Sequence, residues 1–511
     1  MDMNREKNSS KNMDSLSEFI REHYGDDPDR LALQKAKWPG IDVAAAVSTL
    51  LSRRKLAGKA PLWAETEGLV LPRTLSAEQC SSEIAARHKA LVIKKMIGRG
   101  RIADLTGGLG VDCLEFGKIA EAVLYNEMLP ELAAAAEHNF RVLEAGNIEV
   151  CNFEASLRTL GDAGDMKTDA GNKLIDAGDM KTDTGDMKTE AGSEKSEKND
   201  APGGLRKRLE AFRPDVIFLD PARRDGCGKK VFLLEDCSPD ILKIKDLLLD
   251  IAPIIVLKLS PMADIAMLLE RLGPECSEVQ IIEAGGECKE LIVTLKRCKN
   301  ENNPSPEPDS IDGRSDSKHI GADDCPIKIY KLRTGKTAND SAVSSGPDMK
   351  DSAYEDPIET DAPAFEFCRK RENACEAPIL AEMEDLRAGA LLFEPGKALM
   401  KAGCFKLLAK SLNGKLLGRD AHYYIVDSTA PNDLKSLGKT FKIIDTAPLS
   451  GKSMKEFSRR HPEAEVTARG VRMTSEELRR RLGCKPSDRH HIFALHVDKT
   501  GKNLLLFTER I

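Results

Sequence analysis

Short apolar runs alternate with amphipathic helical stretches through the middle of the chain. After each run comes a segment with apolar residues at helical spacing, such as the one that begins near Asp112 and the one that opens with Pro130. Strands that alternate with helices predict a parallel, doubly wound sheet. The predicted strands are 101–105, 122–128, 148–153, 215–223 and 253–260. A further run, 278–297, is interrupted by Gly285 and Gly286 and predicts a terminal hairpin.

The two ends of the chain carry different patterns. Residues 14–97 have helical apolar spacing, and Ser76 with Gln79 predicts a capping box that opens a helix ending before Gly98. Beyond residue 375, short strands and helices mix and predict small α+β units. We therefore expect five segments: a helical domain (1–97), the doubly wound domain (98–298), a linker-rich segment with short strands (299–375) and two α+β units (376–437 and 438–511).

The distribution of charge points to a basic folded part. The net charge of the chain is −6, but the stretches 161–200, 301–325 and 339–361 together carry −16, so the remainder carries +10. The first stretch repeats DAGDMKTD-like units with a single large apolar residue each, which is typical of a disordered insertion. The other two are linkers by composition. A basic remainder is compatible with a nucleic-acid partner.

Other compositional features exclude several classes. None of the thirteen cysteines falls in a CxxC pair, and no Cys/His cluster has zinc spacing, so we expect no metal site and reduced thiols in a cytoplasmic protein. No apolar run is long enough to span a membrane, and the first residues lack the apolar core of a signal peptide. The oligomeric state is left open.

A glycine-rich turn, DLTGGLGVD (104–112), follows the first predicted strand. Its candidate cofactor-binding residues are Asp104, Thr106, Gly107, Gly108, Gly110 and Asp112. Such a turn lets a ligand approach the backbone at a helix start, although it can also serve helix packing alone. A dinucleotide site requires a third glycine where Cys113 stands. The carboxylate of Asp104 favours a cationic ligand over a pyrophosphate.

Polar residues also follow the next strands. Glu127 ends the second one, where a carboxylate can accept hydrogen bonds from the ribose hydroxyls of any nucleoside, although it could also be a solvated acid at a strand end. Asn152 and Phe153 end the third, where an adenine would lie, although they could also be ordinary core and turn residues. DPAR (Asp220 to Arg223) ends the fourth, and Lys258 lies in LKLSP (257–261), which ends the fifth. Ligands of open α/β sheets bind outside these carboxyl ends.

Together these motifs resemble the class I S-adenosylmethionine-dependent methyltransferases. DLTGGLGVD is similar to their first motif, Glu127 to their second, and DPAR to their fourth, although DPAR lacks the second proline and the aromatic residue of NPPY or DPPY. DPAR is also similar to the DPPR of enzymes that methylate C5 of uracil in RNA. Those enzymes have a nucleophilic cysteine where this chain has Ser260, which disfavours that reaction.

The whole chain resembles, more narrowly, a group of bacterial methyltransferase-like proteins common in Bacteroidetes, with a ferredoxin-like segment and a THUMP-like domain at the C-terminus. The residues that carry this resemblance include GGECKEL, FEPGKALMKAGCFK and TARGVRMTSEELRRRL. The resemblance implies a Rossmann-like sheet and S-adenosylmethionine as cofactor. THUMP domains of relatives bind structured RNA, so it also implies RNA, either tRNA or rRNA, as the partner of the basic C-terminal units.

We therefore predict an S-adenosylmethionine-dependent methyltransferase that acts on RNA. Asp220 and Pro221 would hold the acceptor, and Arg223 would hold a substrate phosphate. Lys258 could do likewise or could equally be structural. The alternatives are an RNA-binding protein with a methyltransferase fold but no activity, and a methyltransferase of protein or of a small molecule.

Overall fold

The computed structural model describes residues 2–161, 201–222, 234–298, 321–332 and 362–511. Residues 162–200 of the predicted insertion, most of the two acidic linkers and Arg223 lie outside these ranges. The chain divides into two compact units, Met1–Lys258 with Thr294–Asn303, and Leu259–Val293 with Pro304–Ile511. Within the described residues, no helix is both long and apolar enough to cross a membrane.

The first unit contains five parallel strands in the order β3-β2-β1-β4-β5. Their bounds are β1 (Arg101–Asp104), β2 (Ala122–Asn126), β3 (Ile148–Cys151), β4 (Val216–Leu219) and β5 (Ile254–Leu259). The helices between them are α7 (Val111–Ile119), α8 (Pro130–Val142), α9 (Leu157–Leu160), α10 (Gly204–Phe212) and α11 (Ile241–Ile251). This arrangement confirms the predicted Rossmann-like sheet.

The apolar runs form strands because both faces of a doubly wound sheet are covered. All four residues of β4 are buried, and so are the last five of β5. β4 and β5 pair in parallel with Leu219 opposite Leu257. This register sets Asp220 opposite Lys258, one position further along each strand.

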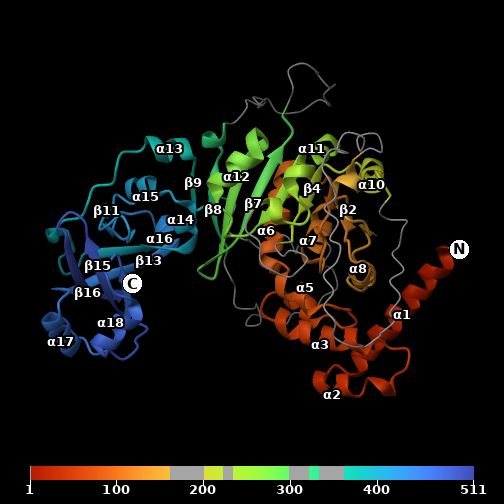
Figure 1. Ribbon diagram of the computed structural model, residues 1–511, viewed down its shortest axis with the longest axis horizontal. Coiled ribbons are helices and arrows are strands. Elements are labelled where there is room, and N and C mark those ends of the chain that lie inside the picture. Colours follow the sequence, from red (N-terminus) through yellow and green to blue (C-terminus); the bar gives the residue numbers. More distant parts are fainter. Residues whose placement is uncertain (1, 162–200, 223–233, 299–320, 333–361) are drawn as a thin grey trace, which may run out of the picture. The chain divides into compact units, whose positions relative to one another are not determined.

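The N-terminal helices belong to the same unit. They are α1 (Asp2–Glu22), α2 (Pro28–Leu33), α3 (Val43–Leu56), α4 (Pro61–Glu65), α5 (Thr74–Gln79) and α6 (Glu83–Ile97), drawn red to orange in Figure 1. α6 packs along α7, and α1 packs on α8. On α8, the buried Asn139 side chain accepts from the Val70 N–H and donates to the Val70 carbonyl, each at 2.8 Å. The predicted helical domain therefore shares its packing with the sheet.

The predicted capping box at Ser76 and Gln79 is wrong. Ser76 lies inside α5, which ends at Gln79, and α6 begins with Ser82 as its cap, whose Oγ accepts from the Ala85 N–H at 3.4 Å. The break between the two helices includes Ser81, whose hydroxyl donates to Asp112 at 2.7 Å and accepts from Lys89 of α6 at 2.9 Å.

The second unit begins at Leu259 and contains most of the predicted hairpin. β6 (Cys276–Ala284) and β7 (Glu287–Lys296) are neighbours in the sheet. Gly285 and Gly286 form the two-residue turn with φ of 61° and 77°, a left-handed pair that disfavours side chains. On the other side of β6, the segment predicted as linker-rich adds β8 (Ile327–Leu332) in parallel and then β9 (Phe365–Phe367) antiparallel. Helices α12 (Ile265–Leu272) and α13 (Arg369–Ala374) flank these strands in the chain.

Residues from Leu391 onwards form one seven-stranded sheet, in the order β11-β12-β10-β13-β16-β15-β14. Its strands are β10 (Leu391–Pro395), β11 (Lys415–Leu416), β12 (Tyr424–Val426), β13 (Gly438–Pro448), β14 (Glu465–Arg469), β15 (His490–Val497) and β16 (Lys502–Arg510), with helices α14 (Lys397–Ala402), α15 (Phe405–Ser411), α16 (Asn432–Ser436), α17 (Gly451–Arg460) and α18 (Ser475–Leu482). The two α+β units predicted here are joined by β10–β13 pairing. They also share a core, in which Leu392 and Tyr423 pack with Phe441 and Phe493.

Candidate functional site

The candidate site lies at the carboxyl ends of β1, β2, β4 and β5. The turn after β1 is glycine-rich for two different reasons. A Cβ on Gly107 would lie 2.1 Å from the Tyr125 ring, so packing forbids a side chain there. A Cβ on Gly108 would meet nothing closer than the Thr106 carbonyl at 3.8 Å, and its φ is +55°. The space beside the Gly108 Cα is therefore open to an approaching ligand, whereas its N–H and carbonyl are held by Glu127 and by the Tyr125 hydroxyl.

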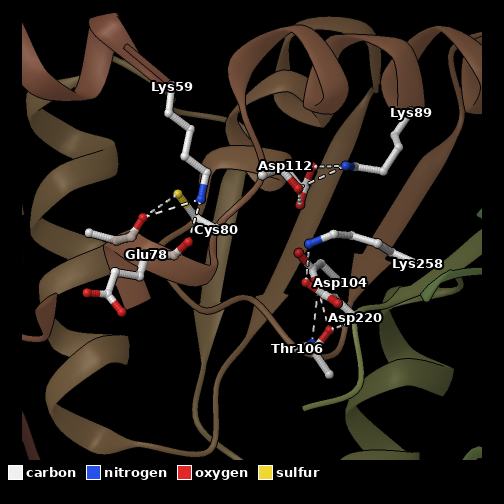
Figure 2. A network of polar contacts seen from close by, with 11 residues as sticks. Lys59, Glu78, Cys80, Lys89, Asp104, Thr106, Asp112, Asp220 and Lys258 are labelled. Carbon is white, nitrogen blue, oxygen red and sulfur yellow. Dashed lines mark hydrogen bonds and ion pairs between the residues drawn. The ribbon is translucent and has the colours of Figure 1, made fainter. Parts of the chain in front are cut away.

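Asp104 ends β1 with its side chain buried. Its Oδ1 accepts the Thr106 N–H at 3.0 Å, and the Thr106 hydroxyl accepts the Asp220 N–H at 2.6 Å (Figure 2). Burial raises the pKa of Asp104 well above its ordinary value, against the Thr106 hydrogen bond, and the carboxylates of Asp112, Asp220 and Glu127 raise it further. A positive charge placed beside Asp104 would relieve this repulsion.

Glu127 follows β2, and its side chain is hydrogen-bonded to the glycine-rich turn after β1. Its two carboxylate oxygens accept the Gly108 N–H and the Leu129 N–H, each at 2.9 Å. Burial raises the pKa of Glu127, although these backbone hydrogen bonds oppose the shift. Each carboxylate oxygen has a second lone pair that can accept a ligand hydroxyl.

The end of β3 lies next to Glu127. The Asn152 amide donates to the Glu127 carbonyl at 2.6 Å. Asn126, which sequence analysis did not single out, is fully buried, donates to the Leu105 and Phe153 carbonyls and accepts the Phe153 N–H. This one amide therefore links the ends of three strands, and the only sequence signal for it is a polar residue inside the apolar run AVLYNEM.

Asp220 and Lys258 face each other from β4 and β5. Lys258 Nζ lies 2.5 Å from Asp220 Oδ2, and the side chains are 10% and 33% exposed, respectively. Pro221 is buried, and Ala222 is tied to Ser238 by two backbone hydrogen bonds. The structure thus brings two of the predicted catalytic residues together as an ion pair and fixes the backbone around them.

Lys89 and Ser81, on the N-terminal side, are site residues that sequence analysis missed. Lys89 Nζ lies 3.0 Å from Asp112 Oδ1, at the start of α7, and donates to Ser81 Oγ at 2.9 Å. Its side chain is 0% exposed. Burial pushes the pKa of Asp112 upward, but Lys89 and Lys258 outweigh it and leave that pKa below its ordinary value. The sequence signal was a lysine on the buried stripe of α6, between Ala85 and Ile93.

Cys80 lies in the same network but shows no sign of being a nucleophile. Its Sγ donates to the Ala77 carbonyl at 3.4 Å, while Lys59 Nζ donates to the Glu78 carbonyl at 2.7 Å. Burial raises the pKa of Cys80 despite the nearby Lys59, so the thiol form is favoured. Figure 2 shows this group on one side of Asp112 and the Asp104–Asp220–Lys258 group on the other. No group of metal-ligating side chains was found among the described residues.

Comparisons with known proteins agree with this architecture. Family models match a ferredoxin-like domain at residues 391–432 and a THUMP domain-like segment at residues 438–510. A solved structure from Porphyromonas gingivalis, named "putative methyltransferase", matches with a TM-score of 0.68 at 24% identity and covers 98% of both chains. This match and the two family models confirm the predicted fold and the predicted pair of C-terminal domain types.

Other matches are partial. A Pyrococcus horikoshii protein named "putative RNA methyltransferase" has 13% identity and a TM-score of 0.25, and covers 45% of this chain and 85% of its own. An Escherichia coli protein named "putative methyltransferase" has 14% identity and a TM-score of 0.24, and covers 46% of this chain and 94% of its own. A search of curated proteins found no match.

The buried Lys89–Asp112 pair gives a stability prediction. Lys89→Met leaves Asp112 without its main cation and is expected to lower the free energy of unfolding by about 3–5 kcal/mol at neutral pH, measured by urea denaturation. The loss should shrink as the pH falls toward the depressed pKa of Asp112, because a protonated carboxyl needs no cation.

Lys55→Met, which removes an exposed pair with Glu78, is the control and should cost no more than about 1 kcal/mol. The double variant Lys89→Met/Asp112→Leu should recover most of the loss. A Lys89→Met loss no larger than that of the control would contradict the structural role given to this pair.

Proposed function

We propose that the chain is an S-adenosylmethionine-dependent methyltransferase that acts on RNA. The observation that carries the donor assignment is that Asp112, Glu127 and Asp220 lie near enough to Asp104 to raise its pKa, beside a turn in which Gly108 leaves open space. The four carboxylates outnumber the two lysines of the site, Lys89 and Lys258. This excess of negative charge favours a cationic sulfonium ligand and disfavours the pyrophosphate of a dinucleotide.

The described residues fit this donor group by group. Glu127 would accept hydrogen bonds from ribose hydroxyls, and Gly107 to Gly110 would face the methionine part. Asn152 and Phe153 would border the adenine. When bound, the donor supplies a methyl group on a positively charged sulfur, which needs little further activation. The chain's contribution would be to position the acceptor, and Asp220 and Lys258 are the polar groups placed to do so.

The RNA assignment rests on exposed cations of the THUMP-like segment. Several arginines there are held by carboxylates, for example Arg460 by Asp445 and Arg489 by Glu509. Ten exposed cations of this segment have no ion-pair partner among the described residues: Lys439, Lys442, Lys452, Lys455, Arg459, Arg472, Arg480, Lys485, Lys502 and Arg510. α17 and α18, which carry four of them, pack side by side (Figure 1). Such a cluster can contact several phosphates of one RNA.

The experiment that tests the proposed function measures which class of macromolecule receives the labelled methyl group. The full-length protein is incubated with donor labelled in the methyl group and with total RNA and total protein from cells lacking the gene. Label is expected in RNA. Label in protein alone would contradict the RNA assignment, and donor binding with no label in any fraction would favour a non-catalytic RNA-binding protein.

The RNA surface has its own test. Replacing Lys452, Lys455 and Arg459 of α17 with alanine is expected to weaken RNA binding. It should also flatten the slope of log affinity against log salt by about 0.7–0.9 for each RNA phosphate that the protein no longer neutralises. The matched control replaces three paired arginines, Arg460, Arg481 and Arg489. If the control triple flattened the salt slope as much, the assignment of the unpaired cations would be wrong.

A further inference from the structure

The ion pair between Asp220 and Lys258 offers a specific pattern of hydrogen bonds. The two side chains come from opposite positions of neighbouring parallel strands, and Figure 2 shows them pointing toward each other. Lys258 Nζ donates a hydrogen bond to Asp220 Oδ2. The other carboxylate oxygen, Asp220 Oδ1, accepts no hydrogen bond from the residues that the structure describes. A carboxylate only accepts hydrogen bonds, and an ammonium only donates them. An incoming acceptor therefore meets an acceptor atom and a donor atom side by side.

We propose that this pair selects a nucleobase lactam, the adjacent N–H and C=O of a guanine or uracil, and directs methylation to its ring nitrogen. This inference rests on the proposed function and names the substrate class of the same site. Asp220 Oδ1 would accept the ring N–H, and Lys258 Nζ would donate to the neighbouring carbonyl oxygen.

The pair also supplies a proton acceptor and a positive charge, both of which methylation of a ring nitrogen needs. The ring N–H proton passes to the Asp220 carboxylate, and the nitrogen lone pair forms the new N–CH₃ bond. The S–CH₃ bond breaks with its electron pair left on sulfur, which becomes a neutral thioether. The negative charge that develops on the carbonyl oxygen as the proton leaves is stabilised by the Lys258 ammonium. The proton is later released from Asp220 to water.

An exocyclic amine would be activated poorly by the same pair. The amino groups of adenine and cytosine stand next to an unprotonated ring nitrogen, to which Lys258 would donate. That hydrogen bond withdraws electron density from the amine and makes it less nucleophilic. The ammonium therefore favours a lactam over an amine electronically, even though both present a donor beside an acceptor.

The methylated nucleoside that the protein produces shows which atom of the base accepts the methyl group. RNA methylated by the full-length protein with a deuterium-labelled methyl donor is digested to nucleosides and analysed by mass spectrometry. Label in 1-methylguanosine or 3-methyluridine is expected. Label on an exocyclic amine, a ring carbon or a ribose hydroxyl would overturn this inference and leave the proposed function standing. Absence of label from RNA would overturn both.

Variants of Lys258 test the same inference through kcat and through the affinity for S-adenosylhomocysteine. Lys258→Met is expected to lower kcat on the order of 10²–10³-fold, the effect of removing one donor from a developing oxyanion. The affinity for S-adenosylhomocysteine should stay within about twofold of the unmodified protein, because the pair would act on the acceptor. Lys258→Arg, which keeps a donor, should recover part of the activity. Lys243→Met, which removes an exposed lysine of α11 paired with the N-cap residue Asp240, should have no effect.

Asp220→Asn separates proton acceptance from binding. At neutral pH the loss in kcat should be on the order of 10²–10⁴-fold. The loss should shrink as the pH rises, because the lactam then ionises without a base. A pH-independent loss accompanied by weaker S-adenosylhomocysteine binding would show that the pair is only structural and would overturn the inference.

Discussion

Burying several carboxylates at one edge of a sheet is the constraint on which the first unit depends. Asp104 is 1% and Glu127 7% exposed, and Asp112 is also largely buried. An uncompensated buried charge is costly, so each carboxylate needs a donor. Asp104 receives a backbone N–H from Thr106, Glu127 receives two from the loops after β1 and β2, and Asp112 receives Lys89 and Ser81. The conformation of the turn, the strand ends and α6 all follow from these contacts.

The N-terminal helices are thus part of the site rather than an appended domain. Lys89 of α6 forms an ion pair with Asp112, and Ser81, in the break before α6, donates a hydrogen bond to the same carboxylate. Trp63 of α4 is fully buried, and its ring would lie 3.4 Å from a Cβ on Gly110. Loss of these helices would therefore be expected to loosen the turn that the proposed donor contacts.

The sequence was informative where a feature depends on local pattern. The strand–helix alternation predicted the parallel sheet, and Gly285–Gly286 predicted the hairpin, because periodicity and turn chemistry are local properties. Ser82 rather than Ser76 caps α6, because Ser81 has a partner 31 residues away that no local pattern reveals. Lys89 and Asn126 were missed for the same reason, and so was the pairing of β10 with β13 that joins the two C-terminal segments. The roles of the predicted site residues remain proposals, although the structure brings Asp104, Glu127, Asp220 and Lys258 to one sheet edge.

The central claim is that this carboxylate cluster binds the positive charge of a methyl donor. The most direct measurement compares S-adenosylmethionine with its neutral product, S-adenosylhomocysteine, by calorimetry in two buffers with different heats of ionisation. Because the pKa of Asp104 is raised in the folded protein and a nearby cation would lower it, binding of S-adenosylmethionine should release protons, and its affinity should rise with pH more steeply than that of the product. Asp104→Asn should remove this difference. No binding of either ligand at a protein concentration of about 100 µM, where a weak ligand would still be seen, or identical proton release for both, would contradict the account.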